Sequence, residues 1–506
     1  MRDWKIPLNT KGAMREMELS SVHRAANGDL AGTARAQFEP AKVMQLDLSQ
    51  QIPSLQAEPY KRYWILVRLY GEPIGTIFVE LDDARTLAPQ ALTQLIWARN
   101  EPAIVARFEQ RGLPKPLTLP VTGFSQDLAQ QLTPTVPADS SLSRPASVVV
   151  CTQGQRPESL KNCLASIDGQ HLPPFEVIVV DNDPSTSGVA HLVGGVKGSL
   201  TYRYIAEPRP GLSWARNAGV EAAVGDIIAF LDDDDEADPD WLLRVIAGFD
   251  SYPDVGCVTG AVLPARIDTR AQELFESIGG HNKGVAFCRR RFTCEGPQSP
   301  LFPLPPFGVG ANMAFTRLAL RSIGGFDVGL GAGTPTFAGE DTLAMTLTLL
   351  SGFSIAYEPG ALVWHLHRRK IEELESQLHG YSIGLTAYYA ALLRHRPRSI
   401  FGLIRLLPSA SAYFRALRSE QALHTIEGSS LNRRRLLAML LGPCAYLGSC
   451  RRQRIVKASL PRTAEDQIPC AELSDAAPSL SSRRSKMEDP RQSRSGHRLP
   501  VSGPRS

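Results

Sequence analysis

Apolar residues in the middle of the chain come in short continuous runs that are separated by helical stretches. The runs "SVVVCT" (147–152), "FEVIVVDN" (175–182), "LTYRYIAE" (200–207) and "DIIAFLDD" (226–233) each predict a strand, and the stretches 158–167 and 213–223 predict helices between them. Apolar strands alternating with helices are typical of βαβ units, whose parallel sheet is buried on both faces. We therefore expect an α/β domain at residues 146–367.

The flanking segments follow other patterns. The sequence "YWILVRLYGEPIGTIFVEL" (63–81) predicts two strands around a Gly-Glu-Pro turn, and a helix is expected near 91–109, which gives a small α+β module at 41–115. A weakly ordered N-terminus (1–40) precedes it, and a connector rich in Pro, Ser and Thr (116–145) follows. After the α/β domain we expect a basic helical extension (368–460) and then a disordered tail (461–506) with almost no aromatic residues.

Composition limits the class of protein. The chain of 506 residues is 43% hydrophobic and 21% charged, with a formal net charge of +4, so we expect several globular domains and no nucleic-acid partner. Its eight cysteines lack the spacing of a zinc site, and the first residues lack the apolar core of a signal peptide. No run reaches the roughly 20 apolar residues of a membrane span. These features predict a cytoplasmic protein.

A dense acidic run follows the fourth expected strand. Seven of the nine residues from Asp232 to Asp240 are acidic, and ligands of open α/β sheets bind at the carboxyl ends of the strands. Asp181 closes the second strand at the same edge. Such hard oxygen ligands suit Mg²⁺ or Mn²⁺. The alternative is that the run caps and solvates a following helix that begins near Asp238.

Other motifs fit the run less well. An EF-hand loop that begins at Asp232 needs Gly at its sixth position and Glu at its twelfth, where this chain has Ala237 and Leu243. The sequence has no Walker A loop, and "GVGANM" (308–313) lacks the strand and helix that surround a dinucleotide fingerprint.

Eight segments occur in an order that resembles a known family. They are "SVVVCTQGQRPESLKNCLASI", "VIVVDN", "PGLSWARNAGVEAA", "IIAFLDDDDEADPDWL", "GANMAFTR", "GGFD", "GEDTLAMTL" and "GFSIAYEPGALVWH". Together, over residues 145–367, they resemble the family-2 glycosyltransferases with a GT-A fold. The resemblance implies a nucleoside-diphosphate sugar as donor, Mn²⁺ or Mg²⁺ as cofactor, and inverting transfer to a hydroxyl of a glycan or lipid-linked acceptor, in exopolysaccharide or cell-envelope synthesis.

The same resemblance assigns the metal site. Asp232 and Asp234 match the family's Asp-x-Asp motif, so Asp232 is expected at the ribose or in the metal's shell and Asp234 on the cation. Either Asp233 or Asp235 could exchange roles with them. His365 matches a late histidine that completes the metal site or touches the diphosphate.

Donor positions are assigned in the same way. Thr152, Arg156 and Asp181 match positions that meet the base and ribose of the nucleotide. Arg216 matches one that approaches the nucleotide or its phosphates, with an exposed helix residue as the alternative, and Asn312 is expected to orient the transferred sugar.

The general base is expected at the start of a later helix. By resemblance Asp341, in "GEDTLAMTL", takes the proton of the acceptor hydroxyl, and a helix N-terminus keeps a carboxylate ionised. Glu340 could equally be a cap. The preceding glycine-rich segment "GLGAGTPTFAG" (329–339) is expected to be a mobile loop.

Two other functions stay open on the residues alone. A glycoside hydrolase also uses paired carboxylates, although it needs no metal cluster, and a sugar-nucleotide sensor or scaffold would need no base.

The extension after residue 366 suggests a further partner. Lys and Arg outnumber Asp and Glu by 16 to 5 between Leu366 and Leu460. Its leucine- and arginine-rich helices predict peripheral contact with an anionic membrane surface at the inner face of the cell membrane. Alternatively, they pack their leucines on the catalytic domain.

Overall fold

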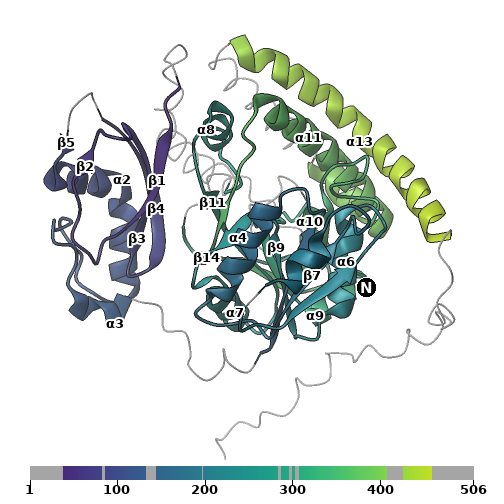
Figure 1. Cartoon of the computed structure of the whole chain (residues 1–506), viewed down its shortest axis with the longest axis horizontal. Coiled ribbons are helices and arrows are strands. Elements are labelled where there is room, and N and C mark those ends of the chain that lie inside the picture. Colours follow the sequence, from purple (N-terminus) through teal and green to yellow (C-terminus); the bar gives the residue numbers. More distant parts are fainter. Residues whose placement is uncertain are drawn as a thin grey trace, which may run out of the picture. The chain divides into compact units, whose positions relative to one another are not determined.

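A nine-stranded sheet forms the centre of the α/β domain (Figure 1). The computed structural model describes residues 38–81, 86–132, 144–196, 198–282, 287–295, 299–301, 307–406 and 426–458. The strands lie in the order β10-β14-β11-β13-β9-β6-β7-β8, and β12 pairs with β14. Their bounds are β6 (Ala146–Thr152), β7 (Glu176–Asp181), β8 (Tyr202–Ala206), β9 (Ile227–Asp232), β10 (Asp235–Ala237), β11 (Val255–Pro264), β12 (Arg290–Phe292), β13 (Asn312–Thr316) and β14 (Ser354–His365).

The four strands predicted from the apolar runs are parallel neighbours. β6 pairs with β7 and β9, and β7 pairs with β8, all in parallel. The register places Thr152 beside Asp181, and Cys151 beside Asp232. The carboxyl ends of these strands therefore form one edge, as expected. Beyond β9 the sheet is mixed, because β13 runs antiparallel to both β9 and β11.

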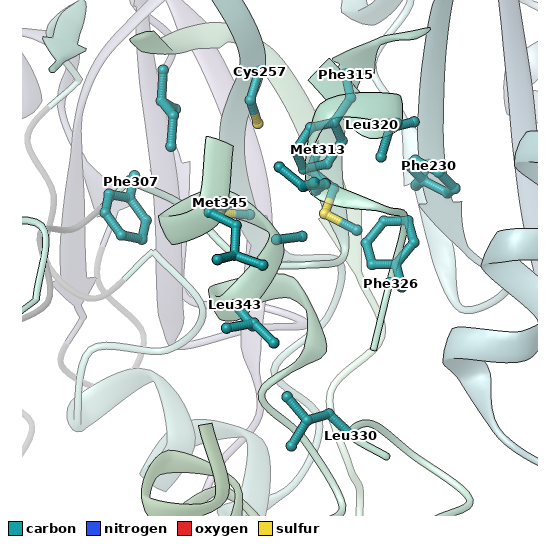
Figure 2. Packing of buried hydrophobic residues seen from close by; sticks show 14 of the residues in the cluster. Phe230, Cys257, Phe307, Met313, Phe315, Leu320, Phe326, Leu330, Leu343 and Met345 are labelled. Carbon is teal, nitrogen blue, oxygen red and sulfur yellow. The ribbon is translucent and has the colours of Figure 1, made fainter. Parts of the chain in front are cut away.

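Helices cover both faces of this sheet (Figure 1). One buried cluster includes residues of α4 (Pro157–Asp168), α5 (Val189–Gly194) and α7 (Trp241–Asp250). The opposite cluster includes residues of α6 (Leu212–Ala222), α9 (Arg317–Ile323) and α10 (Glu340–Leu350). Figure 2 shows its aromatic centre, where the rings of Phe230, Phe315 and Phe326 pack with centroids 5.2 to 6.4 Å apart. Truncating one such ring to alanine costs about 3–5 kcal/mol, so this cluster fixes the strand that carries Asp232.

The N-terminal module has its own core. Its main sheet has the order β1-β3-β4, a second pair joins β2 to β5, and helix α2 packs beside them. Part of the segment expected as a connector belongs to this core, because Leu119, Phe124 and Leu132 are buried in it. The elements are β1 (Ala41–Asp47), β2 (Leu55–Gln56), β3 (Arg62–Leu69), β4 (Glu72–Glu80), β5 (Thr86–Leu87), α2 (Pro89–Gln110), η2 (Gln126–Leu128) and α3 (Ala129–Leu132).

Asp238 does not cap a helix, in contrast to the alternative that the sequence suggested. Helix α7 begins only at Trp241, with Asp240 at its N-cap position and no side-chain cap. The Asp238 carboxylate instead accepts a hydrogen bond of 2.5 Å from Arg68 of β3. The acidic run therefore does not form a simple cap.

The C-terminal helices pack on the catalytic domain. Two tyrosines join the buried cluster that contains Phe230 and Phe315 of the sheet. They are Tyr388 of α11 (Ile371–His395) and Tyr446 of α13 (Ile426–Ala458). Helix α8 (Arg270–Ser277) contacts α11 through a smaller cluster. At Gly442 a Cβ atom would lie 2.0 Å from Thr386 Oγ1, so α13 crosses α11 at close range.

Several expectations concern residues outside the described part of the chain. The disordered tail expected at 461–506 lies wholly there, and so does nearly all of the N-terminus expected to be weakly ordered. Within the described ranges, none of the helices combines the length and apolar character that a membrane crossing requires.

Candidate active site

The acidic run divides between two strands. β9 ends at Asp232, the chain turns at Asp233 and Asp234, and β10 begins at Asp235. β10 pairs antiparallel with the end of β14, which places Asp235 opposite His365. The predicted carboxylates thus lie at the carboxyl edge of the sheet, and the fold adds the histidine to them.

Three of these residues could hold a metal ion. Asp234, Asp235 and His365 each offer a ligand atom, and these atoms lie within 4.8 Å of one another. His365 Nδ1 lies 2.7 Å from Asp235 Oδ1 and 3.6 Å from Asp234 Oδ1. Asp235 is fully buried, and its Oδ2 has no hydrogen-bond partner among the residues that the structure describes. A divalent cation would satisfy this oxygen, so the two carboxylates and one imidazole fit such an ion.

This group differs in one member from the expected ligands. Asp232 is not part of it; its side chain is 32% exposed and lies 3.3 Å from Arg216 Nη2. Partial burial and the neighbouring carboxylates raise the pKa of Asp232 to about 7, against the effect of Arg216. The alternative in which Asp235 exchanges roles with Asp232 therefore agrees with the geometry.

Two arginines balance the acidic group. Arg156 donates a hydrogen bond to Asp234, and Arg368 Nη1 lies 4.0 Å from the same carboxylate. Although burial acts to raise it, His365 and these arginines hold the pKa of Asp234 below its ordinary value. Both arginines are about one-third exposed, so each can reach a ligand at this edge. Arg368 was not expected from sequence.

Thr152 and Asp181, which are also expected to contact the donor, are hydrogen-bonded to other side chains of the protein. Thr152 Oγ1 donates to Asp233 Oδ2 at 2.6 Å. Asp181 is 1% exposed, and it accepts hydrogen bonds from Ser187 Oγ and Tyr204 Oη at 2.5 and 3.0 Å. These contacts fix the orientation of both side chains at the edge where β6 and β7 end.

Arg216 is buried at the centre of the site, contrary to the alternative of an exposed helix residue. Its side chain is 2% exposed, and it donates to Glu340 Oε1 at 2.8 Å, to Asp232 at 3.3 Å and to the carbonyl oxygen of Gly310 at 3.1 Å. Burial and the charge of Asp341 raise the pKa of Glu340 to about 7, against the effect of Arg216. Arg216 therefore joins the end of β9 to the start of α10.

Asp341 is the second residue of α10, which begins directly after Gly339, whose φ is +103°. It is half-buried, its Oδ2 accepts from the Gly310 amide at 2.7 Å, and its Oδ1 accepts from the Thr342 amide at 2.6 Å. Two backbone donors thus orient a carboxylate that is still partly open to solvent. An ionised carboxylate in this position can accept a proton.

Asn312, expected to orient the transferred sugar, is buried and hydrogen-bonded within the protein. It is 1% exposed; its Nδ2 donates to the carbonyl oxygens of Ala261 and Ala361, and its Oδ1 accepts from Trp241 Nε1. These bonds hold β11, β14 and α7 together. Because the protein uses its polar atoms, we leave Asn312 out of the donor site.

Part of the chain is similar in sequence to known proteins. Residues 147–324 match the model of the family described as glycosyl transferase family 2. A glucosyl-dolichyl phosphate glucuronosyltransferase of Haloferax volcanii is 28% identical over 192 residues, which are 37% of this chain and 56% of the relative. The succinoglycan biosynthesis protein ExoM of Rhizobium meliloti is 38% identical over 102 residues, or 19% of this chain and 32% of the relative. The chain thus spans about half, or less, of the length of these relatives.

A solved structure is also similar at low identity. The mannosyltransferase PcManGT from Pyrobaculum calidifontis, in complex with GDP-Man and Mn²⁺, is 18% identical and has a TM-score of 0.39, with 70% of this chain and 99% of that chain covered. The matched family region comprises β6 to β9 and their helices, the acidic run and β13. The family match thus identifies a glycosyl transferase family 2 domain, with the α/β GT-A fold, at residues 147–324 of this chain.

Proposed function

We propose that the chain is a glycosyltransferase that moves a sugar from a nucleoside-diphosphate sugar to a hydroxyl of a glycan or lipid-linked acceptor, in exopolysaccharide or cell-envelope synthesis. One observation carries the proposal: Asp234, Asp235 and His365 lie close enough together to hold a metal ion, at the carboxyl edge of the sheet that contains the family 2 match. The names of the relatives support it, since one acts on a glucosyl-dolichyl phosphate and another takes part in succinoglycan biosynthesis.

The donor's diphosphate is the natural ligand of this edge. Asp234, Asp235 and His365 would hold Mn²⁺ or Mg²⁺, and the bound cation would act as a Lewis acid that stabilises the charge of the leaving diphosphate. Arg156 and Arg368, which now lie at Asp234, would turn to the phosphate oxygens. An arginine suits this role because its planar group donates to two oxygens at once.

The acceptor's proton would go to Asp341. Two backbone donors at the start of α10 hold its carboxylate in place, so it is oriented to accept the proton. The acceptor oxygen then attacks the anomeric carbon from the side opposite the diphosphate, which inverts the configuration there.

Thermal unfolding with added nucleotides tests the donor site. We expect UDP or GDP to raise the unfolding temperature only together with Mn²⁺. Asp234→Asn should abolish this rise, whereas Glu236→Gln, an exposed residue of the same acidic run, should retain it. Equal stabilisation in excess EDTA would refute the metal-assisted donor site.

Asp341→Asn separates binding from transfer. Loss of a general base costs roughly 10²–10⁴-fold in rate, so the variant should transfer sugar far more slowly while nucleotide and Mn²⁺ still stabilise it. A screen of nucleotide sugars for hydrolysis or transfer identifies the donor on which to measure this. A variant as active as the wild type would mean that another group is the base.

We further propose that α13 contacts the inner face of the cell membrane. Its outward side carries Leu440, Leu447 and Ile455 at spacings of seven and eight residues. Leu440 is 74% exposed, Leu447 60% and Ile455 70%. Exposed arginines, Arg451 among them, lie in the last turns. An apolar stripe beside basic residues is typical of helices that lie in the lipid interface. Each basic residue near an anionic leaflet adds about 1 kcal/mol of attraction.

Sedimentation with vesicles of phosphatidylserine and phosphatidylcholine tests this contact. We expect the full chain to bind at low salt, to release at high salt, and to lose binding when Leu440→Glu and Leu447→Glu are combined. Leu318→Glu is the matched control, because Leu318 is 67% exposed on α9 and does not belong to the stripe. Binding that is unchanged by the double substitution would exclude α13 as the contact.

A further inference from the structure

Three histidines gather beside the carboxylate group. We propose that His281, His365 and His367 bind a transition-metal ion such as Zn²⁺, at a site that shares His365 with the group at Asp234 and Asp235 and has two ligands of its own. Each histidine offers one ring nitrogen, and these three nitrogens lie within 4.8 Å of one another. The proposal goes beyond the glycosyltransferase function and does not depend on it.

The backbone brings these rings together from two elements. His365 closes β14, and His367 follows it two residues later. Beyond α8 the chain reverses at Gly279 and Gly280, whose φ angles are +102° and +54°, and this turn places His281 beside the strand. The rings of His281 and His365 have centroids 4.5 Å apart, and those of His365 and His367 5.2 Å apart.

Carboxylates contact one nitrogen of two of the rings and thereby orient them. Asp235 Oδ1 lies 2.7 Å from His365 Nδ1, and Glu276 Oε1 lies 2.8 Å from His367 Nε2. Histidine ligands of zinc usually make such a bond through their second nitrogen, which fixes the ring and strengthens the ligand. The Nδ1 atom of His367 is buried and has no hydrogen-bond partner within the described part of the chain. A metal ion would supply that partner.

Ligand chemistry favours Zn²⁺ here over Mn²⁺ or Mg²⁺. Imidazole nitrogen suits zinc, copper and nickel, whereas manganese and magnesium prefer oxygen. At Zn–N distances of about 2.0–2.1 Å, the nitrogens around a tetrahedral ion lie roughly 3.3 Å apart, which is compatible with nitrogens that lie within 4.8 Å of one another. Three protein ligands leave the fourth position open. Bound zinc would tie the loop after α8 to the end of β14, and it would engage His365, which both groups share.

Metal titration of the full chain without an affinity tag tests the site. After EDTA treatment and removal of the chelator, we expect the chain to bind one tight Zn²⁺ ion. Co²⁺ in its place should give the visible absorption of a four- or five-coordinate ion. His281→Ala and His367→Ala should each weaken Zn²⁺ binding at least tenfold, and Glu276→Gln should weaken it roughly 10–100-fold. His379→Ala, at an exposed histidine of α11, should leave it unchanged.

A further variant separates this site from the donor site. Asp234→Asn should retain Zn²⁺ and the Co²⁺ spectrum but lose Mn²⁺. The proposal is overturned if zinc affinity is unchanged in both histidine variants, or if Asp234→Asn abolishes zinc binding, since the ion would then lie on the carboxylates. Circular dichroism of each variant checks that it is folded. Absence of glycosyl transfer would leave the zinc titration unaffected, so the two failures are distinguishable.

Discussion

Replacing Arg216 should destabilise the fold more than replacing either of its acidic partners. Arg216→Met removes the charge and keeps most of the volume of the side chain. In the wild type the guanidinium donates hydrogen bonds to the buried Glu340, the partly exposed Asp232 and the carbonyl oxygen of Gly310. The substitution leaves these acceptors without their donor.

The expected magnitude follows from burial. At pH 8, where Glu340 is ionised in the folded protein, removing its partner costs about 3–5 kcal/mol, because the remaining charge stays in a poorly solvating environment. Glu340→Gln should cost only about 1–2 kcal/mol, since the glutamine carbonyl still accepts a hydrogen bond from Arg216. In the double variant Glu340 is no longer a buried acid without a partner. The double variant should therefore be about 1–3 kcal/mol more stable than the sum of the two single costs predicts.

The pH dependence gives a second readout. Glu340 has a folded-state pKa of about 7 against an ordinary value of 4.5. Between these values the folded protein keeps a proton that the unfolded chain has released. This group's contribution to the free energy of unfolding therefore falls as pH rises from 4.5 to about 7. Glu340→Gln should lack that part of the slope.

Urea unfolding in EDTA, followed by tryptophan fluorescence, measures all four proteins. The chain has six tryptophans, and a series from pH 5 to 8 covers the relevant range. The reasoning fails if Arg216→Met lies within about 1 kcal/mol of the wild type, or if the two costs are additive. Either result would mean that water, and not Arg216, stabilises the acids.

Three further predictions concern α13 and its contacts. Although burial acts to raise it, hydrogen bonds from His395 and Tyr446 hold the pKa of Asp327 below its ordinary value of 3.8. Above pH 3.8 the Asp327 carboxylate contributes its full stabilisation, and this contribution is lost as the pH falls through the pKa of Asp327 in the folded protein. The urea midpoints of the wild type and of Asp327→Asn should therefore converge at acidic pH. Gly442→Val should cost about 1–3 kcal/mol by overpacking the crossing of the helices. Gly448→Ala, where a Cβ meets nothing within 4 Å, should instead stabilise α13 by about 0.5–1 kcal/mol in the same assay.

The parts of the fold that sequence predicted depend on local pattern. The parallel strands β6 to β9 were readable because each is a continuous apolar run that ends in polar residues. Their common edge then followed from the geometry of parallel sheets. The place of β13 was not readable, because "NMAFT" has the same local pattern and only tertiary packing sets it antiparallel between β9 and β11.

The parts of the site that sequence missed depend on partners that are distant in the chain. Arg216 could be taken for a surface residue until Glu340, 124 residues away, was seen to pair with it. Asn312 could be taken for a ligand contact until the structure placed a hydrogen bond from Trp241 on its side chain. No local spacing reports whether a polar side chain faces a ligand or another part of the protein, so motif matches locate the site better than they assign its members.

The acidic run shows the same limit within four residues. From sequence, Asp232 to Asp235 appear interchangeable, yet each aspartate has a different partner, because the chain turns between β9 and β10 and directs successive side chains to different elements. In order along the run, the partners are Arg216, Thr152, Arg156 and His365. Repulsion among the four carboxylates is therefore offset by separate contacts, two of which are to arginines. It follows that the aspartates cannot substitute for one another: a change at Asp233 should affect the orientation of Thr152, whereas a change at Asp235 should release His365 from both metal-binding groups to which it belongs.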